Sequence, residues 1–156
     1  MSSDLPTTAT PLWFIDNLVY IHVDGEGSQG AYCLCEIWGA RGNMSPLHVH
    51  HADEETFYVR DGEVRLFIGD REILLRAGQA ALAPRGVPRT YRVESEQAKW
   101  IVINSPAGFE HFMRAASEPA AEAELPPPGR PSDAAALAKA AAVQGIEVLG
   151  PPGALP

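Results

Sequence analysis

The chain has 156 residues, a formal net charge of -8 at pH 7 and a pI near 5.0. This acidic balance argues against nucleic-acid or anionic-membrane partners, because both need clustered Lys and Arg. The length suits one domain with one sizeable core, so we expect a single domain over residues 1–156. The N-terminal stretch has no basic segment, and no run approaches the ~18 apolar residues of a membrane helix, so we expect a cytoplasmic protein.

Short β-rich segments separated by turn residues fill the first two thirds of the chain. They are residues 13–23, 31–38, 55–59, 64–68, 72–76, 79–83, 90–93 and 98–103. Turn signals every ~8–10 residues, with short β-rich runs between them, are typical of an antiparallel all-β sandwich or barrel. Cys33 and Cys35 share one face of the second segment, and we interpret them as reduced structural thiols.

The stretch from Gly42 to Gly62 concentrates groups that can bind a metal. His48 and His50 are two residues apart, so in a strand both rings point to the same face, with Cα atoms roughly 6.6 Å apart. Glu55 begins the next strand-like run and can reach the same pocket. Two imidazoles and one carboxylate form the ligand set of non-haem divalent metals with open coordination positions. The pattern therefore predicts a metal site, the alternative being a solvated, histidine-rich loop.

The spacing of these residues resembles the first signature motif of the cupin superfamily. Gly42, His48, His50, Glu55 and Gly62 are separated by five, one, four and six residues, and every position fits. The resemblance implies an all-β fold, a double-stranded β-helix (jelly-roll) barrel over about residues 12–105. By the same resemblance we expect a homodimer.

A second cupin motif normally follows, and this chain matches it only in part. Gly78, Pro84 and Gly86 stand in their expected places, whereas Arg89 replaces the fourth ligand histidine and Val93 replaces an asparagine. A guanidinium has five donors and no acceptor, so Arg89 cannot be an ordinary metal ligand. If it points inward, it places a fixed positive charge where a divalent cation should bind.

Three functional hypotheses follow. In the first, His48, His50 and Glu55 hold iron, manganese, nickel, copper or zinc, and the chain resembles quercetin dioxygenases acting on aromatic or polyketide-like compounds. In the second, the site is metal-free, Arg89 anchors an anion, and the histidines and Glu55 are acid/base groups of a cyclase, isomerase, dehydratase or lyase. In the third, the pocket binds a small molecule without converting it.

Arg89 also has a purely structural interpretation. If Pro88 shifted the strand register by one residue, Arg89 would face solvent and pair with Glu94 or Glu96. With Glu55 inward, we expect an apolar pocket suited to an aromatic ligand. Its predicted lining residues are Phe57, Leu66, Ile101 or Ile103, and Phe109.

Residues 106–156 differ in composition from the barrel and form a linker and helical extension. Residues 118–131 are rich in Ala, Glu and Pro, which favours an extended linker. Ser132 or Asp133 can cap a helix that runs to about Gln144, with Gly145 after its end and a short strand at 146–149. We interpret this extension as an external brace or dimer contact rather than an active-site lid.

Overall fold

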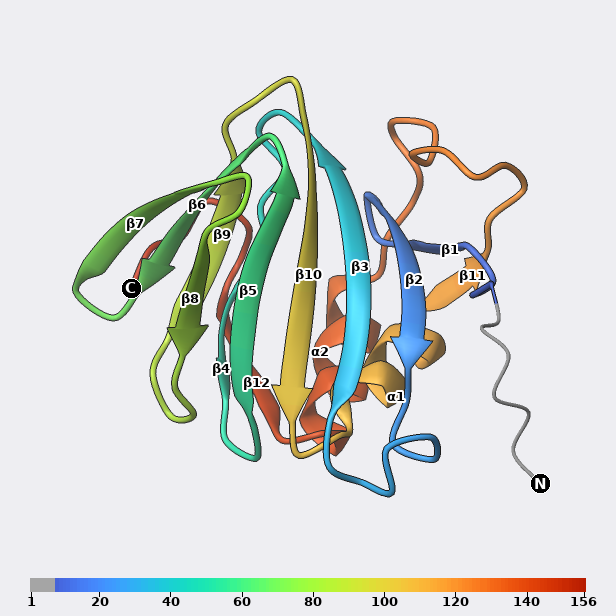
Figure 1. Cartoon of the computed structure of the whole chain (residues 1–156), viewed down its shortest axis with the longest axis horizontal. Coiled ribbons are helices and arrows are strands. Elements are labelled where there is room, and N and C mark those ends of the chain that lie inside the picture. The colour runs from blue at the N-terminus through green and yellow to red at the C-terminus, as the bar shows by residue number, and fades with distance from the viewer. Residues whose placement is uncertain (1–7) are drawn as a thin grey trace.

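The computed structural model of the protein describes residues 8–156 and consists of two antiparallel β-sheets with two short helices (Figure 1). In spatial order, the first sheet contains β11 (Ser117–Pro119), β1 (Leu12–Phe14), β2 (Asn17–Val23), β3 (Cys33–Ala40), β10 (Gln97–Ser105), β5 (Glu54–Asp61) and β8 (Ala80–Ala83). The second contains β12 (Ile146–Gly150), β4 (Leu47–His50), β9 (Arg89–Val93), β6 (Glu63–Ile68) and β7 (Arg71–Arg76). The helices are α1 (Phe109–Ala115) and α2 (Ala134–Val143).

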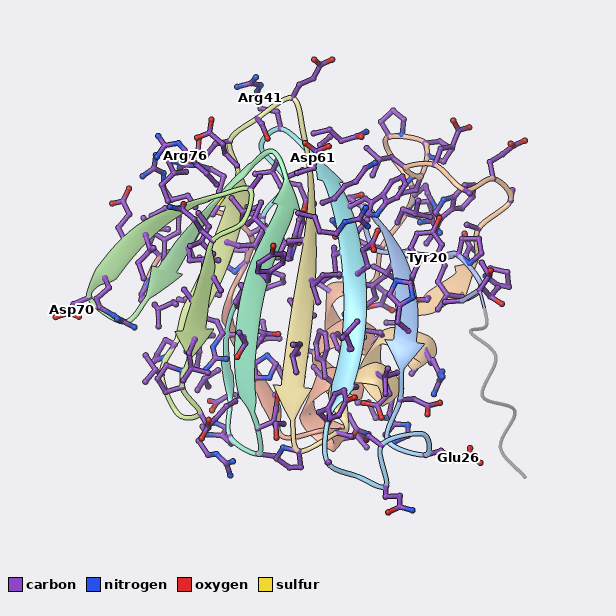
Figure 2. All side chains as sticks on the ribbon, in the orientation of Figure 1. Tyr20, Glu26, Arg41, Asp61, Asp70 and Arg76 are labelled. Carbon is purple, nitrogen blue, oxygen red and sulfur yellow. The ribbon has the colours of Figure 1, made fainter. Side chains whose placement is uncertain are left out.

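Alternation along the strands places the core between the two sheets. In β10, Ala98, Trp100, Val102 and Asn104 are each at most 1% exposed, while the residues between them are partly exposed. Charged side chains such as Glu26 and Arg76 lie in the turns and at the rim (Figure 2). The expected all-β jelly-roll barrel with a short C-terminal helical extension is therefore confirmed.

The two cysteines belong to this core. Cys33 and Cys35 are both fully buried and unpaired in β3, as the structural interpretation expects. Contact with Cys33 and burial raise the pKa of the Cys35 thiol, so this sulfur stays protonated.

The N-terminal β-rich segment differs from its prediction. Instead of one strand over residues 13–23, β1 and β2 form a hairpin that turns at Ile15 and Asp16. Ile15 adopts a φ of 56°, a left-handed conformation that β-branched residues rarely take. Because isoleucine favours strands, its residue type gives no sign of this turn.

The C-terminal extension is joined to the second sheet. The Asp133 side chain accepts a hydrogen bond from the Ala136 N–H at 3.0 Å and caps α2, as expected. Gly145 follows α2 with a φ of 74°. The chain then forms β12, which pairs with β4 so that Val148 lies opposite His48 and Ile146 lies opposite His50. None of the helices in residues 8–156 has the length and apolar character needed to cross a membrane.

Candidate functional site

Strands β4 and β5 bring the predicted ligand residues together. The ligand atoms of His48, His50 and Glu55 all lie within 4.8 Å of one another. His50 is fully buried and Glu55 is 3% exposed. The two histidine rings therefore point to the same face of β4, as their two-residue spacing predicts, and together with Glu55 they form a candidate metal centre.

Hydrogen bonds from the Nδ1 atoms fix the orientation of both imidazole rings. His48 Nδ1 lies 2.7 Å from the Pro46 carbonyl oxygen, which can only accept, so Nδ1 carries the proton. His50 Nδ1 lies 3.0 Å from both carboxylate oxygens of Asp53 and donates to them. Both Nε2 atoms are left with lone pairs, and His50 Nε2 is buried without a partner among residues 8–156. Burial, followed by the neighbouring His50, lowers the pKa of His48 to about 4, which keeps it neutral near pH 7.

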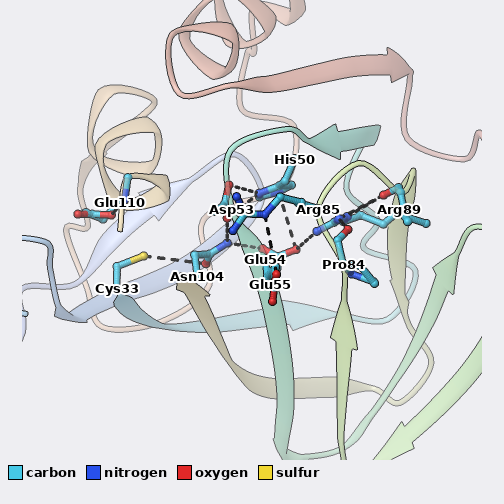
Figure 3. Close-up of polar contacts among 12 residues, drawn as sticks. Cys33, His50, Asp53, Glu54, Glu55, Pro84, Arg85, Arg89, Asn104 and Glu110 are labelled. Atoms are coloured by element: carbon cyan, nitrogen blue, oxygen red, sulfur yellow. Dashed lines mark hydrogen bonds and ion pairs between the residues drawn. The ribbon is translucent and has the colours of Figure 1, made fainter. Parts of the chain in front are cut away.

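A polar network lies behind the ligands (Figure 3). The Asn104 amide donates to Asp53 Oδ2 at 2.8 Å and to Glu55 Oε2 at 3.2 Å, and all three residues are at most 5% exposed. Partners of this kind orient metal-binding histidines and carboxylates. Sequence reasoning missed Asp53 and Asn104. The sequence contains no signal for Asn104, because its orientation follows from that of Trp100 in an apolar run without alternation.

Arg89 points into the site from β9, opposite His48 (Figure 3). It is 1% exposed, and its Nη1 lies 3.7 Å from Glu55 Oε1. Its Nε and Nη2 donate to the Val87 carbonyl at 3.2 Å, and Nη2 also donates to the Pro84 carbonyl. Nη1 has no hydrogen-bond partner in the described part of the chain. Burial lowers the pKa of Arg89, and the charges of Glu55 and Asp53 oppose this shift.

The solvent-facing interpretation of Arg89 is wrong. Glu94 instead accepts from the side chains of Arg65 and Arg92, at 2.9 and 2.8 Å. The register that puts Arg89 inward is held by pairing of the whole of β9 with β6, so Pro88 introduces no shift.

The site opens into a cavity of about 580 Å³. His48 and Glu55 lie on its wall, and the rest of the lining is mainly apolar and includes the aromatic side chains of Phe14, Phe57, Trp100, Phe109 and Phe112. Its size is within the range of small-molecule pockets, ~300–1,000 Å³. The Phe109 ring packs against His50, with centroids 5.6 Å apart.

Two predicted features of this cavity need correction. Trp100 and Val102 line it instead of Ile101 or Ile103, because an apolar run of four residues carries no alternation to show which face is buried. Leu66 is buried in the core but is not among the cavity residues.

The extension is also a wall of the cavity rather than only an external brace. Leu137, Ala138 and Ala141 of α2 and Ile146 and Val148 of β12 line it. The expectation of an external brace was therefore wrong, and the expected dimer contact stays a prediction.

Comparison with known proteins places this geometry in a family context. The family described as Cupin domain matches residues 39–104. Quercetin 2,3-dioxygenase from Bacillus subtilis (strain 168) is 28% identical over 107 residues, which cover 69% of this chain and 32% of that protein. The match thus spans about a third of the length of this curated relative.

Solved structures support the fold. The polyketide cyclase RemF from Streptomyces resistomycificus has a TM-score of 0.55 and 19% identity, over 67% of this chain and 79% of that one. An oxalate decarboxylase from Lactobacillus farciminis has a TM-score of 0.56 and 18% identity, over 64% of this chain and 32% of that one. At these identities the likeness shows the same architecture and nothing about chemistry.

Proposed function

Because this chain belongs to the cupin superfamily, we propose that it is a metal-dependent oxygenase of aromatic or polyketide-like small molecules, similar in chemistry to quercetin 2,3-dioxygenase. The observation that carries this proposal is the fully buried His50 Nε2, which has no hydrogen-bond partner among residues 8–156 and lies 3.8 Å from Glu55 Oε1. A buried acceptor without a partner is costly, and a cation between His48, His50 and Glu55 would satisfy it. Iron, manganese, nickel, copper and zinc all suit two imidazoles and a carboxylate.

The residues around the centre have separable roles in this proposal. The bound metal would supply a Lewis acid with open coordination positions for redox chemistry with dioxygen. Asp53 holds the proton on His50 Nδ1, and Asn104 occupies Glu55 Oε2 so that Oε1 faces the centre. Arg89 would hold an anionic substrate oxygen beside the metal, since its Nη1 donors are unused.

A redox-neutral enzyme is the second candidate, and the position of Arg89 favours it. Its guanidinium already lies 3.7 Å from Glu55, so it supplies a positive charge to the site without any metal. Arg89 would then stabilise an enolate or phenolate, and His48, His50 and Glu55 would exchange protons with the substrate in a cyclisation, isomerisation, dehydration or lyase reaction. A non-catalytic small-molecule binder is the remaining alternative.

Metal content of the untagged protein, purified without chelators, separates these candidates. We expect about one metal per chain after reconstitution, lost in His48→Ala and Glu55→Ala. His51→Ala is the matched control, because His51 is exposed and pairs with Glu147 outside the site. Dioxygen consumption with quercetin should follow metal occupancy across the variants.

Two outcomes would contradict the oxygenase. If no metal binds after reconstitution, the redox-neutral enzyme becomes the better hypothesis. Equal occupancy in His48→Ala and wild type would place the metal elsewhere. The expected homodimer, single domain and cytoplasmic location stay predictions; light scattering of the same preparation tests the first.

A further inference from the structure

A second polar cluster lines the same cavity, apart from the candidate metal centre. Asn17 from β2, Asn43 from the turn before β4 and Tyr91 from β9 all face it. The Tyr91 hydroxyl lies 2.9 Å from Asn43 Oδ1 and 3.4 Å from Asn17 Oδ1. Asn17 Nδ2 lies 2.9 Å from Asn43 Oδ1. Neither the oxygenase nor the redox-neutral hypothesis uses these residues.

The direction of each hydrogen bond can be assigned. Asn17 Nδ2 lies 3.2 Å from the Trp38 carbonyl, which can only accept, so this atom of Asn17 is the amide nitrogen. Its second N–H donates to Asn43 Oδ1, which therefore is an oxygen and also accepts from the Tyr91 hydroxyl. The Asn43 NH2 group is left over. Among residues 8–156 it donates to no protein group, and it belongs to a residue on the cavity wall.

The cluster thus offers complementary groups to one ligand oxygen. The Asn43 amide can donate to a hydroxyl or carbonyl oxygen of a ligand, and the Tyr91 oxygen can also accept from a ligand hydroxyl. Burial raises the pKa of the Tyr91 hydroxyl above its ordinary value, so the group keeps its proton near neutral pH. The Tyr91 ring is fixed edge-on against Trp100, with centroids 4.9 Å apart, which limits its motion.

Tyr91 of the polar cluster lies on the same strand as Arg89, which contacts the candidate metal centre. Tyr91 is two residues after Arg89 on β9, so both side chains project from the same face, with Cα atoms roughly 6.6 Å apart. A flat ring system that places one oxygen beside His48 and Glu55 can extend through the cavity toward Tyr91, since all three residues line it. Hydrogen bonds at both ends would fix its orientation.

We propose that Asn17, Asn43 and Tyr91 form a second recognition site, which binds a hydroxyl or carbonyl oxygen at the far end of an aromatic substrate whose first oxygen lies at the His48, His50 and Glu55 centre. This proposal rests on the proposed function, because it takes the same cavity as the substrate site. It narrows the substrate class to multi-ring aromatic compounds that carry oxygens at both ends.

The test compares two flavonols that share the metal-binding hydroxyl and ketone. Quercetin carries additional ring hydroxyls, and 3-hydroxyflavone lacks them. Calorimetric titration should show that the wild-type protein binds quercetin about 10-fold more tightly than 3-hydroxyflavone, which is the effect of roughly one well-placed hydrogen bond. Tyr91→Phe and Asn43→Ala should weaken quercetin binding about 5- to 10-fold and leave 3-hydroxyflavone binding unchanged.

Tyr58→Phe is the matched control, because it also removes one phenolic hydroxyl, from a tyrosine that is 42% exposed. If both tyrosine variants keep the wild-type preference, the second recognition site is overturned, while metal binding and dioxygen consumption still test the proposed function separately. If wild type binds neither flavonol, both proposals are overturned for this substrate class. Should Asn43→Ala unfold, Tyr91→Phe alone decides, since it changes only the hydroxyl.

Discussion

At the scale of single residues, Arg89 sets the electrostatics of the site. A buried guanidinium is costly unless its donors are satisfied and its charge is paired. The carbonyls of Pro84 and Val87 satisfy Nε and Nη2, and Glu55 supplies the opposing charge at 3.7 Å. The same carboxylate is the predicted metal ligand. Arg89 and a divalent cation therefore compete for Glu55, and their like charges repel.

Replacement of Arg89 tests this competition. Arg89→His removes the charge and offers a third imidazole as a fourth ligand, so we expect metal affinity to rise roughly 10-fold or more. Arg89→Met removes the charge without adding a ligand, so it should give a smaller increase in metal affinity. Competition with a chromogenic chelator measures both constants. Unchanged metal affinity in both variants would show that Arg89 does not act on the site.

At the scale of elements, the turn between β5 and β6, which connects the two sheets, shows why a motif position is fixed. Gly62 has a φ of 79°, and a Cβ there would lie 2.3 Å from the Gln97 carbonyl oxygen. Only glycine avoids both the left-handed strain and this contact. The turn connects β5, which carries Glu55 and pairs with β10, to β6 in the other sheet.

Gly62→Ala should therefore destabilise the protein by about 3 kcal/mol or more, the sum of a backbone clash and an unfavourable φ. Gly78→Ala is the control, because Gly78 has a φ of 88° but no atom within 4 Å of the position that an added Cβ would occupy. The Gly78→Ala variant should lose only about 1 kcal/mol of unfolding free energy. Urea unfolding gives both free energies. Similar losses in the two variants would refute the steric role of Gly62.

The elements also show how far the sequence predicts the structure. Alternation and turn residues located most strands, and the spacing of His48, His50 and Glu55 predicted their convergence, because strand parity is a local property. Prediction failed at Ile15, whose turn is imposed by the pairing of β1 with β2 and β11. It failed again in the apolar run of β10, so the inward position of Asn104 was missed.

At the scale of the whole molecule, the cavity is closed by chain segments far apart in sequence. β12 adds to the edge of the sheet beside β4, and α2 lies against β12 (Figure 1). Residues of both elements line the cavity. Composition predicted the helix, its cap and the last strand. The docking of these elements could not be predicted, because the Ala-rich α2 carries no pattern that identifies its partner surface.

If α2 is a wall of the binding cavity, filling its inner face should reduce ligand binding without unfolding the barrel. Ala138 lines the cavity, whereas Ala135 on the same helix is exposed and does not. We expect Ala138→Phe to weaken quercetin binding roughly 10-fold, because the ring would take up cavity volume, and Ala135→Phe to have no effect. Calorimetric titration measures the affinities, and thermal unfolding verifies that both variants fold. Equal affinities would mean that ligands do not reach this wall and that the extension acts on stability alone.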